Sequence, residues 1–507
     1  MSEGYTSVPA MIRAHAAARP GAIALVQDER QLSYGALADV MNRLAAALQR
    51  EGVAPRESVA ICAGTSIEYA CVFLGALQAG VAVAPIAPSS TADSIVDMIA
   101  DCGAKIFFLD KAVADELGDR LARVKAKLVA LDDGAPGAPY DEFIAPAGAQ
   151  PTPVALTAEM PFNIIYSSGT TGTPKGIVQS HGMRYGHVAR AQAMGYGEGA
   201  VTLLSTPLYS NTTLVSFFPT LGLGGTVVLM KKFDAAQYLA LAQKHRVTHT
   251  MLVPVQYSRL MAREDFDAYD LSSFVMKFCT SAPFSAALKA DVLKRWPGGL
   301  IEYFGMTEGG GTCVLAAHVY PDKLHTVGQP APGHDIRVID EDGRELPRGE
   351  IGELVGRSEL MMSGYHNRKS QTDAATWVSP EGLAFIRTGD VGRFDTDGFV
   401  ELMDRKKDMI ISGGFNIYPS DLEAVMRQHP DVADVAVVGV PSADWGETPV
   451  AFVVSRGADA ETLRAFVNER VGKTQRISAV ELIDELPRSH IGKILKRELR
   501  DAFAARS

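Results

Sequence analysis

A loop at residues 167–175 places the strongest constraint on this chain, because it follows an apolar segment and carries groups that suit an oxyanion. Residues 162–166 read Phe-Asn-Ile-Ile-Tyr, which indicates a buried strand, and the chain continues Ser-Ser-Gly-Thr-Thr-Gly-Thr-Pro-Lys-Gly. Backbone N–H groups in a glycine-rich turn can converge on phosphate oxygens, while hydroxyls add donors and a lysine neutralises charge. We therefore predict a phosphate-binding loop made of Ser167, Ser168, Gly169, Thr170, Thr171, Gly172 and Lys175.

The order of residues in this loop differs from that of the common nucleoside-triphosphatase loop, which ends in Gly-Lys-Ser/Thr. Here Pro174 precedes Lys175 and Gly176 follows it. By composition alone, a loop rich in Gly, Ser and Thr is more often a plain solvent-exposed connection. The prediction therefore rests on the order of the residues in the loop.

The bulk properties exclude several classes of protein. A length of 507 residues exceeds what one core holds, and at about 150 residues per domain it suggests roughly three structural units. A formal net charge of -10 argues against nucleic acid or an anionic membrane as the main partner. The five cysteines are odd in number and lack a Cys-x-x-Cys spacing, so we expect buried thiols in a reducing compartment.

The start of the chain has no basic and apolar leader, and no apolar stretch reaches the roughly 18 residues that a bilayer span requires. The longest candidate, residues 69–85, is interrupted by Gln78, Gly75 and Gly80 and indicates a core helix followed by a strand. We therefore expect a cytoplasmic protein without a membrane span.

Apolar runs alternate with helical patterns along much of the chain, which is typical of α/β layers with mostly parallel sheets. The clearest strands are expected at residues 59–62, 105–109, 127–131 and 226–229, and the clearest helices at residues 34–50 and 235–245. Residues 133–153, rich in Pro, Gly and Ala, indicate a loop between subdomains. Residues 336–352 contain an Asp-Gly turn and indicate a more antiparallel, barrel-like piece.

A second boundary is expected at residues 404–408, where charged residues interrupt an apolar pattern. Beyond it the sequence predicts, in order, a helix, two strands and a helix at residues 419–428, 432–440, 449–454 and 462–471. These elements indicate a compact α+β unit of about a hundred residues, which is a usual domain size.

Four further segments follow the loop, and together with it they resemble the adenylate-forming superfamily of acyl-CoA synthetases, luciferases and peptide-synthetase adenylation domains. They are residues 304–308 (Phe-Gly-Met-Thr-Glu), 387–390 (Arg-Thr-Gly-Asp), 404–416 (beginning Asp-Arg-Lys-Lys-Asp) and 487–493 (Pro-Arg-Ser-His-Ile-Gly-Lys). With residues 59–88 and 352–365, the resemblance spans nearly the whole chain. It implies an α/β fold with a large N-terminal domain of stacked α/β subdomains plus a barrel-like β piece, residues 1–404, and a small mobile α+β C-terminal domain, residues 405–507.

The resemblance implies an AMP-forming acid–thiol ligase, namely an ATP-dependent carboxylic acid:CoA ligase. The carboxylate would attack the α-phosphate of ATP to give an acyl-adenylate and pyrophosphate, and the thiol of CoA would then displace AMP. Because two anions meet in the first step, that step needs charge neutralisation and alignment, and no covalent nucleophile on the enzyme.

Matching segment by segment, the resemblance assigns Thr307 to the α-phosphate and Glu308 to Mg²⁺, a hard cation that prefers carboxylate and phosphate oxygens. Asp390 and Arg405 would contact the ribose. The segment Tyr303, Phe304 and Gly305 would lie at the adenine, where one of the two rings would stack, although either ring also fits a core position.

On the small domain, the resemblance makes Lys493 the catalytic lysine, whose compact ammonium would bridge the carboxylate and the α-phosphate during adenylation. Lys407 matches the hinge residue. Rotation about it would withdraw Lys493 and bring Ser412, Gly413 and Gly414 to the site, where the missing side chains leave room for a pantetheine arm.

The resemblance also places the acyl pocket, at Tyr209, Ser210, Thr280, Ser281, Ala282, Gly309 and Gly310. Ser210 departs from the family, because His or an aromatic residue commonly stands there. The lining offers no obvious extra cation, so an uncharged fatty or aromatic acid is expected over a dicarboxylate; only Arg259, on a predicted helix, argues for the latter. Residues 474–478 depart from the family pattern too, which leaves Arg476 a weak candidate for CoA contacts.

Three other functions remain open at this stage. The chain could load a separate carrier protein as a stand-alone adenylation enzyme, it could oxidise its own adenylate as luciferases do, or it could be a non-enzymatic nucleotide-binding regulator on the same fold. The sequence leaves the identity of the acid and a homodimer open. The expected ligands are ATP, Mg²⁺, CoA and a small carboxylic acid.

Overall fold

A computed structural model gives the structure of residues 4–167, 174–405, 408–412, 415–442, 445–472, 475–489, 492 and 494–506. The chain divides into two compact units. Unit 1 comprises Met1–Leu324, Ala331–His334 and Arg357–Ile386, and unit 2 comprises His325–Pro330, Asp335–Gly356 and Arg387–Ser507. The predicted domain division after residue 404 stays a prediction.

Unit 1 contains an eight-stranded sheet that carries the predicted phosphate loop at one of its antiparallel turns. Its strands, in spatial order, are β19 (Gly364–Tyr365), β9 (Lys175–Ser180), β8 (Pro161–Ser167), β4 (Ala82–Pro85), β3 (Ser58–Cys62), β5 (Ile106–Leu109), β6 (Lys127–Ala130) and β7 (Ala138–Pro139). The strands from β8 to β7 pair in parallel, whereas β9 runs antiparallel to both β8 and β19. The predicted strands near residues 59, 105 and 127 are thus confirmed as neighbours.

A second sheet of unit 1 is also mostly parallel. Those of its strands that belong to unit 1 are, in spatial order, β15 (Thr312–Ala316), β14 (Gly299–Gly305), β13 (Met276–Cys279), β12 (His249–Leu252), β10 (Val201–Leu204), β11 (Thr226–Leu229), β1 (Ile23–Gln27) and β2 (Arg30–Ser33). Among these strands, β2 pairs antiparallel with β1 and β15 pairs antiparallel with β14, whereas the other pairs are parallel. The predicted mostly parallel α/β architecture is therefore confirmed.

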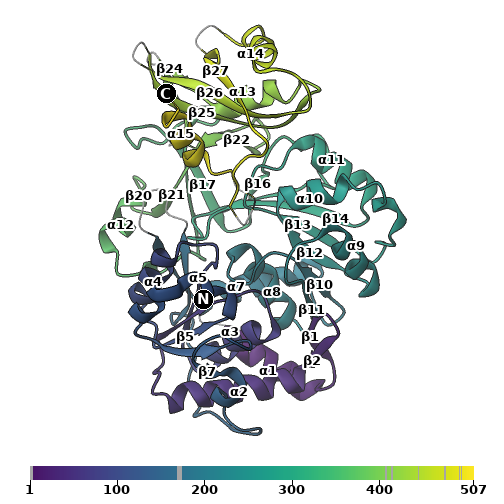
Figure 1. Ribbon diagram of the computed structural model, residues 1–507, viewed down its shortest axis with the longest axis vertical. Coiled ribbons are helices and arrows are strands. Elements are labelled where there is room, and N and C mark those ends of the chain that lie inside the picture. The colour runs from purple at the N-terminus through teal and green to yellow at the C-terminus, as the bar shows by residue number, and fades with distance from the viewer. Residues whose placement is uncertain are drawn as a thin grey trace. The chain divides into compact units, whose positions relative to one another are not determined.

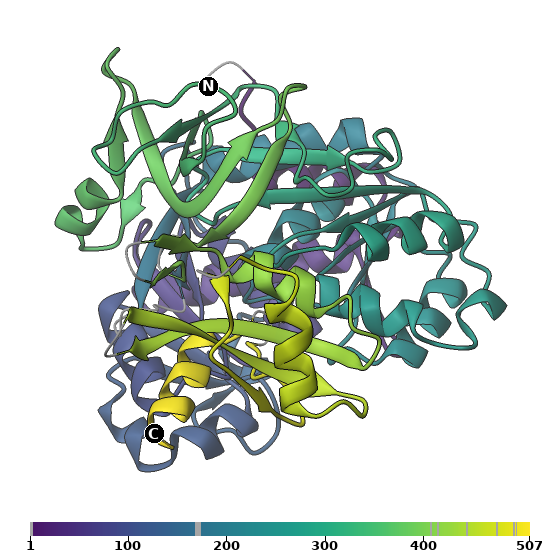
Figure 2. The ribbon, with the colours of Figure 1, turned by 90° about the horizontal axis from the view of Figure 1, so that it is seen from above.

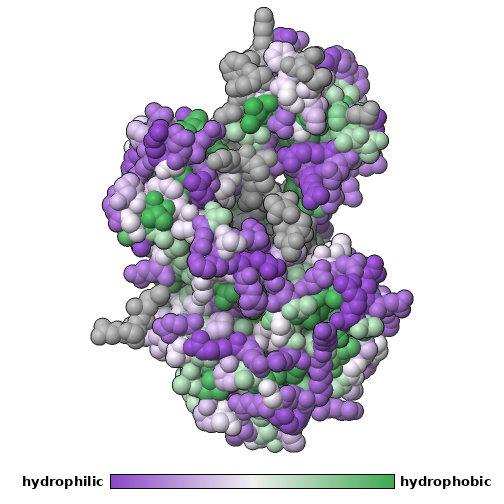
Figure 3. Space-filling view, turned by 90° about the vertical axis from the view of Figure 1, so that its left-hand side faces the viewer, coloured by the Kyte–Doolittle hydropathy of each residue, from purple (hydrophilic) through white to green (hydrophobic). Residues whose placement is uncertain are grey.

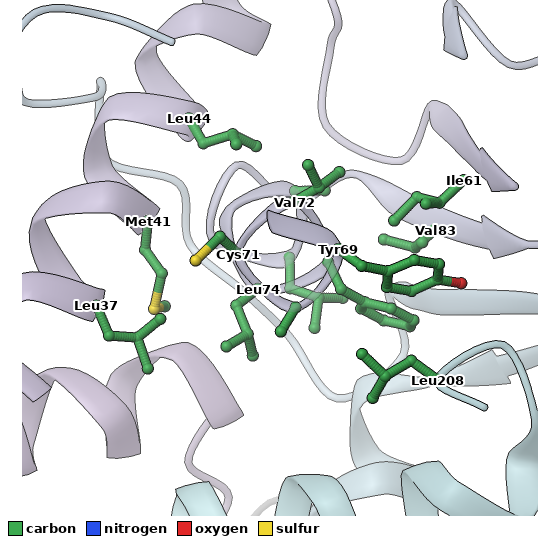
Figure 4. Packing of buried hydrophobic residues seen from close by; sticks show 14 of the residues in the cluster. Leu37, Met41, Leu44, Ile61, Tyr69, Cys71, Val72, Leu74, Val83 and Leu208 are labelled. Carbon is green, nitrogen blue, oxygen red and sulfur yellow. The ribbon is translucent and has the colours of Figure 1, made fainter. Parts of the chain in front are cut away.

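One apolar core joins elements of both sheets through the helices between them. The helices that contribute most to it are α1 (Val8–Ala18), α2 (Tyr34–Arg50), α3 (Ile67–Gln78) and α8 (Asn211–Gly222). α3 is buried on all sides except at Glu68, and Figure 4 shows its Cys71 and Leu74 toward α2 while Tyr69 lies among strand residues. Such a helix, apolar all round, forms where it is packed on every face.

Unit 1 contains further helices. They are α4 (Ala92–Asp101), α5 (Lys111–Leu117), α6 (Tyr140–Phe143), α7 (His181–Ala191), α9 (Ala235–Lys244), α10 (Pro254–Met261), α11 (Ala286–Arg295) and α12 (Lys369–Ala374). Figure 1 shows α9, α10 and α11 on the outer side of strands β12, β13 and β14. Residues 133–153, predicted as a loop, contain β7 (Ala138–Pro139) and α6. The ring of Phe143, the last residue of α6, is buried against the core.

The N-terminal part of unit 2 is antiparallel, as predicted. It is built on β17 (His334–Ile339), β18 (Gly352–Ser358), β21 (Ala384–Phe394) and β22 (Val400–Arg405). The first three residues of β21 belong to unit 1, where they pair antiparallel with β20 (Thr376–Val378). The Asp342-Gly343 turn lies between β17 and β18, and Gly343 has a φ of +80°, which favours glycine.

The C-terminal part of unit 2 is an α+β sandwich of sheet and helices (Figure 2). Its elements are β23 (Ile410–Ser412), β24 (Phe415–Ile417), α13 (Pro419–Met426), β25 (Val432–Ser442), β26 (Gly446–Ser455), α14 (Ala460–Asn468), β27 (Ala479–Leu482) and α15 (Lys496–Ala504). Successive side chains of a strand face opposite sides. Accordingly, Val435 and Val437 pack with α13 and α14, whereas Ala436 and Val438 pack on the side of α15.

On the face shown in Figure 3, hydrophilic residues predominate and apolar ones form small groups. Within the described residues, none of the helices combines the length and the apolar character needed to cross a membrane. All five cysteines are buried and unbridged, as predicted.

Candidate nucleotide and acyl site

The predicted phosphate loop joins two paired strands of unit 1. Ser167 ends β8 and lies opposite Lys175, which begins β9. The side chain of Ser167 and the predicted loop residues Ser168, Gly169, Thr170, Thr171 and Gly172 lie outside the described part of the chain. What the structure does establish is the anchor of the loop, a two-stranded hairpin whose Tyr166 donates from its hydroxyl to Asp101 Oδ2 at 2.8 Å.

Thr307 and Glu308 lie in the turn between β14 and β15. Gly305 pairs with Thr312 across this turn, so the segment from Tyr303 to Gly305 forms the last residues of β14. Gly309 and Gly311 have φ values of +75° and +94°, a region that residues with a Cβ rarely adopt. These two glycines are therefore needed for the backbone of the turn.

Neighbouring elements hold the backbone of this turn. Gln179 Nε2 donates to the carbonyl of Thr307 at 2.7 Å, and the amide of Met362 donates to the carbonyl of Glu308 at 2.8 Å. Ser358 Oγ donates to the carbonyl of Gly309 at 3.0 Å. The carbonyls of three consecutive residues are thus fixed, which leaves the side chains of Thr307 and Glu308 in a defined place.

Tyr365 connects the phosphate loop with the turn. Its hydroxyl donates to Glu308 Oε1 at 2.9 Å, and Lys175 Nζ lies 5.1 Å from the centre of its ring. Burial raises the pKa of Tyr365, and the charge of Glu308 raises it further, so the hydroxyl keeps its proton at neutral pH. Lys175 and Glu308 therefore lie on two sides of one tyrosine.

Glu308 suits a magnesium ion that is bound mainly through phosphate. Among the described residues, no group of three or more His, Cys, Asp or Glu side chains could hold a metal. Mg²⁺ commonly uses one or two carboxylates together with substrate phosphates and water. With Oε1 bound to Tyr365, Glu308 retains acceptor capacity for such an ion.

The aromatic residues at the end of β14 are partly packed in the core. The ring of Tyr303 stacks against Phe278 with 5.8 Å between ring centres, and Thr280 Oγ1 donates to the carbonyl of Tyr303 at 2.9 Å. Phe304 is half-buried. Adenine stacking on either ring stays a prediction.

The structure brings two of the predicted pocket segments together. Ser210 precedes α8, and Thr212 in the first turn of that helix shares a hydrogen bond of 2.6 Å with Ser281 Oγ. Ser281 has a φ of +81°, an uncommon conformation for a residue with a side chain, which is often associated with functional sites. By contrast, the side chain of Arg259 is exposed on α10.

Burial also raises the pKa of Tyr209 to about 12, so its hydroxyl stays protonated at neutral pH and can donate. Ala282 follows Ser281 in the same loop, and Gly310 is buried in the β14–β15 turn. The predicted pocket residues thus come from the start of α8, the end of β13 and the β14–β15 turn, all in unit 1.

Sequence reasoning missed a buried cation that contacts the start of α8. Arg184 lies on α7 with 1% of its surface exposed, and it donates to Asn211, the first residue of α8, at 2.9 Å. A signal existed in the sequence, because Arg184 lies three residues after His181 and four before Val188, on the helix face that is buried.

In unit 2, the two predicted ribose residues are neighbours across a ladder. Asp390 on β21 pairs with Arg405 on β22. The amide of Asp390 donates to Thr388 Oγ1 at 3.0 Å, and that hydroxyl donates to the carbonyl of Leu354 at 2.7 Å. The side chain of Arg405 lies outside the described residues.

Most of the predicted mobile-domain chemistry falls outside the described residues, namely Lys407, Gly413, Gly414 and Lys493. Their neighbours are described. Ser412 pairs with Phe415 and Gly446, and Arg488 Nη1 donates to the carbonyl of Gly492 at 2.7 Å. Arg476, the weak candidate for CoA contacts, is exposed.

Comparison with known proteins gives matches along nearly the whole chain. Residues 12–366 match the family described as AMP-binding enzyme, and residues 421–493 match the AMP-binding enzyme C-terminal domain. An indoleacetate–CoA ligase from Aromatoleum aromaticum (strain DSM 19018 / LMG 30748 / EbN1) is 34% identical, with 97% of each chain covered.

Two further matches differ in the acceptor or the bound ligand that their names give. A fatty acid–[acyl-carrier-protein] ligase, ScoC, from Streptomyces coeruleorubidus is 32% identical, with 96% of this chain and 95% of that protein covered. The crystal structure of ATP-bound MatB from Rhodopseudomonas palustris superposes with a TM-score of 0.88 at 28% identity, covering 98% of this chain and 99% of MatB.

Proposed function

Because the chain belongs to the AMP-binding enzyme family, we propose that it is an ATP-dependent carboxylic acid:CoA ligase that works in two steps through an acyl-adenylate. The observation that carries the proposal is the position of Tyr365 between Lys175 and Glu308. It links the strand that follows the Gly/Ser/Thr loop to the turn that carries Thr307. One compact region thereby offers a cation, a carboxylate and a hydroxyl donor to a nucleotide triphosphate.

The first step requires that two anions approach each other. Lys175 and the loop at residues 167–175 would hold the β- and γ-phosphates, and Thr307 would donate to the α-phosphate. Mg²⁺, when bound at Glu308, supplies charge neutralisation on the phosphate oxygens. Fixed donors in a partly buried site stabilise developing charge without reorganisation, which is the main contribution that this chemistry needs.

The second part of the proposal concerns the small domain. Lys493 would bring its ammonium to the reacting carboxylate and α-phosphate, and rotation about Lys407 would replace it by Ser412, Gly413 and Gly414. Asp390 and Arg405 would hold the ribose hydroxyls; their backbone pairing across β21 and β22 supports a joint role.

An uncharged acid, aromatic or fatty, fits the pocket residues, and the names of the indoleacetate and fatty-acid relatives favour the same classes. The relative that loads an acyl-carrier protein supports a second candidate, transfer of the acyl group to a carrier protein in place of CoA. In either case the first step is the same. We propose a cytoplasmic location, where ATP and CoA are available, and leave the oligomeric state to measurement.

The test is a panel of acids from acetate to long-chain and hydroxycinnamic acids, scored for AMP release with and without CoA. We expect acid-dependent pyrophosphate release for at least one acid and AMP release that depends on CoA. If AMP is released only with a carrier protein, the second candidate replaces the first. If no acid supports pyrophosphate release, the ligase proposal is wrong and a regulator is favoured.

Lys493→Ala tests the assigned division of the two steps. We expect this variant to lose pyrophosphate release by about 100-fold or more, because one donor to developing charge is commonly worth this much. Thioester formation from supplied acyl-adenylate should persist. Arg497→Ala, which removes a nearby exposed charge, is the matched control. Full adenylation by Lys493→Ala would contradict the role given to this lysine.

A further inference from the structure

Arg184 is a buried cation that has no carboxylate partner among the residues that the structure describes. Its Nε donates to Asn163 Oδ1 at 3.1 Å, and its Nη2 donates to Asn211 Oδ1 at 2.9 Å and to Gln179 Oε1. Its Nη1 is buried and has no partner among the described residues. Taking an unpaired charge out of water is costly, so a fold that keeps one invites a functional explanation.

Aromatic rings and side-chain amides around Arg184 stabilise its positive charge, although they carry no negative charge that would balance it. The guanidinium carbon lies 5.8 Å from the ring centre of Phe162 and 5.7 Å from that of Phe218, distances at which aromatic faces attract a cation. Burial lowers the pKa of Arg184 to about 9, which still leaves it protonated at neutral pH. Amide dipoles and ring faces thus offset a positive charge that no carboxylate of the described residues balances.

Arg184 also decides how the neighbouring amides point. A guanidinium only donates hydrogen bonds, so Asn163, Gln179 and Asn211 must all turn an oxygen toward it. For Gln179 this leaves the NH₂ group facing away, and it donates to the carbonyl of Thr307 at 2.7 Å. Arg184 therefore helps to set the orientation of Gln179, and through it the backbone of Thr307, together with Asn163, which Arg184 also orients and whose Nδ2 donates to Gln179 Oε1 at 3.0 Å.

The same guanidinium holds the start of α8. Asn211 is the first residue of that helix, and Thr212 beside it shares the 2.6 Å hydrogen bond with Ser281. One buried side chain is thus connected to the turn that would contact the α-phosphate and to the helix end that would line the acyl pocket.

We propose that Arg184 is a positioning residue for acid activation: it fixes Thr307 through Gln179 and the first turn of α8 through Asn211, and it adds an unpaired positive charge next to both. This rests on the proposed function, in which a carboxylate and ATP meet between these elements. Arg184 does not contact either reactant. It sets the geometry and the electrostatic potential of the groups that do.

The experiment compares Arg184→Met, Arg184→Lys and Gln179→Glu with the wild type in two half-reactions. Adenylation is followed by acid-dependent exchange of pyrophosphate into ATP, and thioester formation is followed from supplied acyl-adenylate. Arg190→Met, on the same helix but exposed, is the control. Melting temperature is recorded for every variant.

For Arg184→Met we expect kcat of exchange to fall by about 10- to 100-fold, the range seen when an outer partner of a site residue is lost, with thioester formation within about 3-fold. Arg184→Lys, which keeps the charge and loses the planar fork, should fall between Met and the wild type. Arg190→Met should match the wild type. If the role of Arg184 were purely structural, Arg184→Met would instead lower the rates of both half-reactions together with the melting temperature, and Arg184→Lys would be no more active than Arg184→Met.

Gln179→Glu keeps the test decisive if Arg184→Met does not fold. A glutamate, which is the same size as glutamine, gives Arg184 a carboxylate partner. It also removes the NH₂ group that donates to the carbonyl of Thr307. We expect a folded protein with a melting temperature at or above that of the wild type, in which exchange falls by about 10-fold or more. Exchange within threefold of the wild type in this variant overturns the inference.

The wild-type arm separates this inference from the proposed function. Exchange that needs both acid and ATP supports the function, and only the ratio of variant to wild type bears on Arg184. If the wild type exchanges nothing, the proposed function is wrong, and calorimetric titration with ATP alone decides about Arg184. Equal ATP affinity of wild type, Arg184→Met and Gln179→Glu would then reject the inference, and about fivefold weaker binding in both variants would support it.

Discussion

Replacing Tyr365 by Phe isolates the hydrogen bond that holds Glu308. The change removes the hydroxyl that donates to Glu308 Oε1 at 2.9 Å and keeps the ring whose centre lies 5.1 Å from Lys175 Nζ. The carboxylate would then be free to rotate away from the place where it meets Mg²⁺ and phosphate. The expected defect lies in adenylation and is largest when Mg²⁺ is scarce.

The size of the defect follows from the bond that is lost. A hydrogen bond to a charged group contributes about 1.5–3 kcal/mol, and about 1.4 kcal/mol corresponds to a factor of ten. Tyr365 is only half-buried, so water can replace part of this energy, and the lower end of the range applies. We expect kcat/KM for ATP in pyrophosphate exchange to fall by about 10-fold.

The assay is exchange of pyrophosphate into ATP over a series of Mg²⁺ concentrations. The apparent Mg²⁺ requirement of Tyr365→Phe should rise, and saturating Mg²⁺ should recover part of the rate. Tyr166→Phe is the matched control, because it loses a similar bond of 2.8 Å to a carboxylate, that of Asp101, and leaves the bond between Tyr365 and Glu308 in place. It should leave the Mg²⁺ dependence unchanged.

Two outcomes would refute this reasoning. The first is a Tyr365→Phe enzyme within twofold of the wild type at every Mg²⁺ concentration. The second is an equal shift in the Tyr166→Phe control, which would mean that the loss reflects general loosening of the sheet. Tyr365→Leu should be worse than Phe, since it also removes the ring beside Lys175.

Two further changes test the surroundings of the site. His181 is 1% exposed, and burial lowers its pKa to about 4, whereas the pKa of an unfolded histidine is about 6.5. The folded protein therefore holds His181 neutral at a pH where the unfolded chain binds a proton. The free energy of unfolding should fall by up to about 3 kcal/mol as the pH drops from 6.5 to 4. Urea unfolding at pH 7 and pH 5 should show that His181→Phe loses less unfolding free energy between these two pH values than the wild type does. Equal losses in both proteins would show that His181 is not the cause. Gly309→Ala should cost about 1 kcal/mol or more in unfolding free energy and lower pyrophosphate exchange, because φ is +75° there, whereas Gly197→Ala in open space should do neither.

Much of the fold could be predicted from the sequence because its elements are amphipathic or wholly apolar. The helix at residues 34–50 and the strand at residues 226–229 have the predicted bounds. The elements within residues 133–153 could not be predicted, because Pro, Gly and Ala dominate there and only a few apolar side chains, chiefly Phe143 and Ile144, pack the segment against the core. That packing depends on the tertiary structure, which local composition does not encode.

The candidate site divides in the same way. The sequence alone could name Thr307, Glu308 and Lys175, because each of them lies in a short motif with a recognisable order of residues. Tyr365 and Arg184 could not be named, since their partners Glu308 and Asn211 are distant in sequence and meet them only in the fold. An arginine on the buried face of α7 was a visible anomaly, but its meaning depends on which amides surround it.

The contacts inside unit 2 constrain how Lys493 can act. On one side of the predicted hinge, Asp408 accepts a bond of 2.8 Å from Arg500 on α15. On the loop before Lys493, Arg488 binds the carbonyl of Gly492 at 2.7 Å and the carboxylate of Asp434 at 2.5 Å. Both segments are thus tied to the C-terminal part of unit 2, the body that follows residue 407 in the chain. If Lys493 enters and leaves a reaction centre, its loop must travel with that body, because a local movement would break these ion pairs, whereas a rotation at residue 407 would keep them.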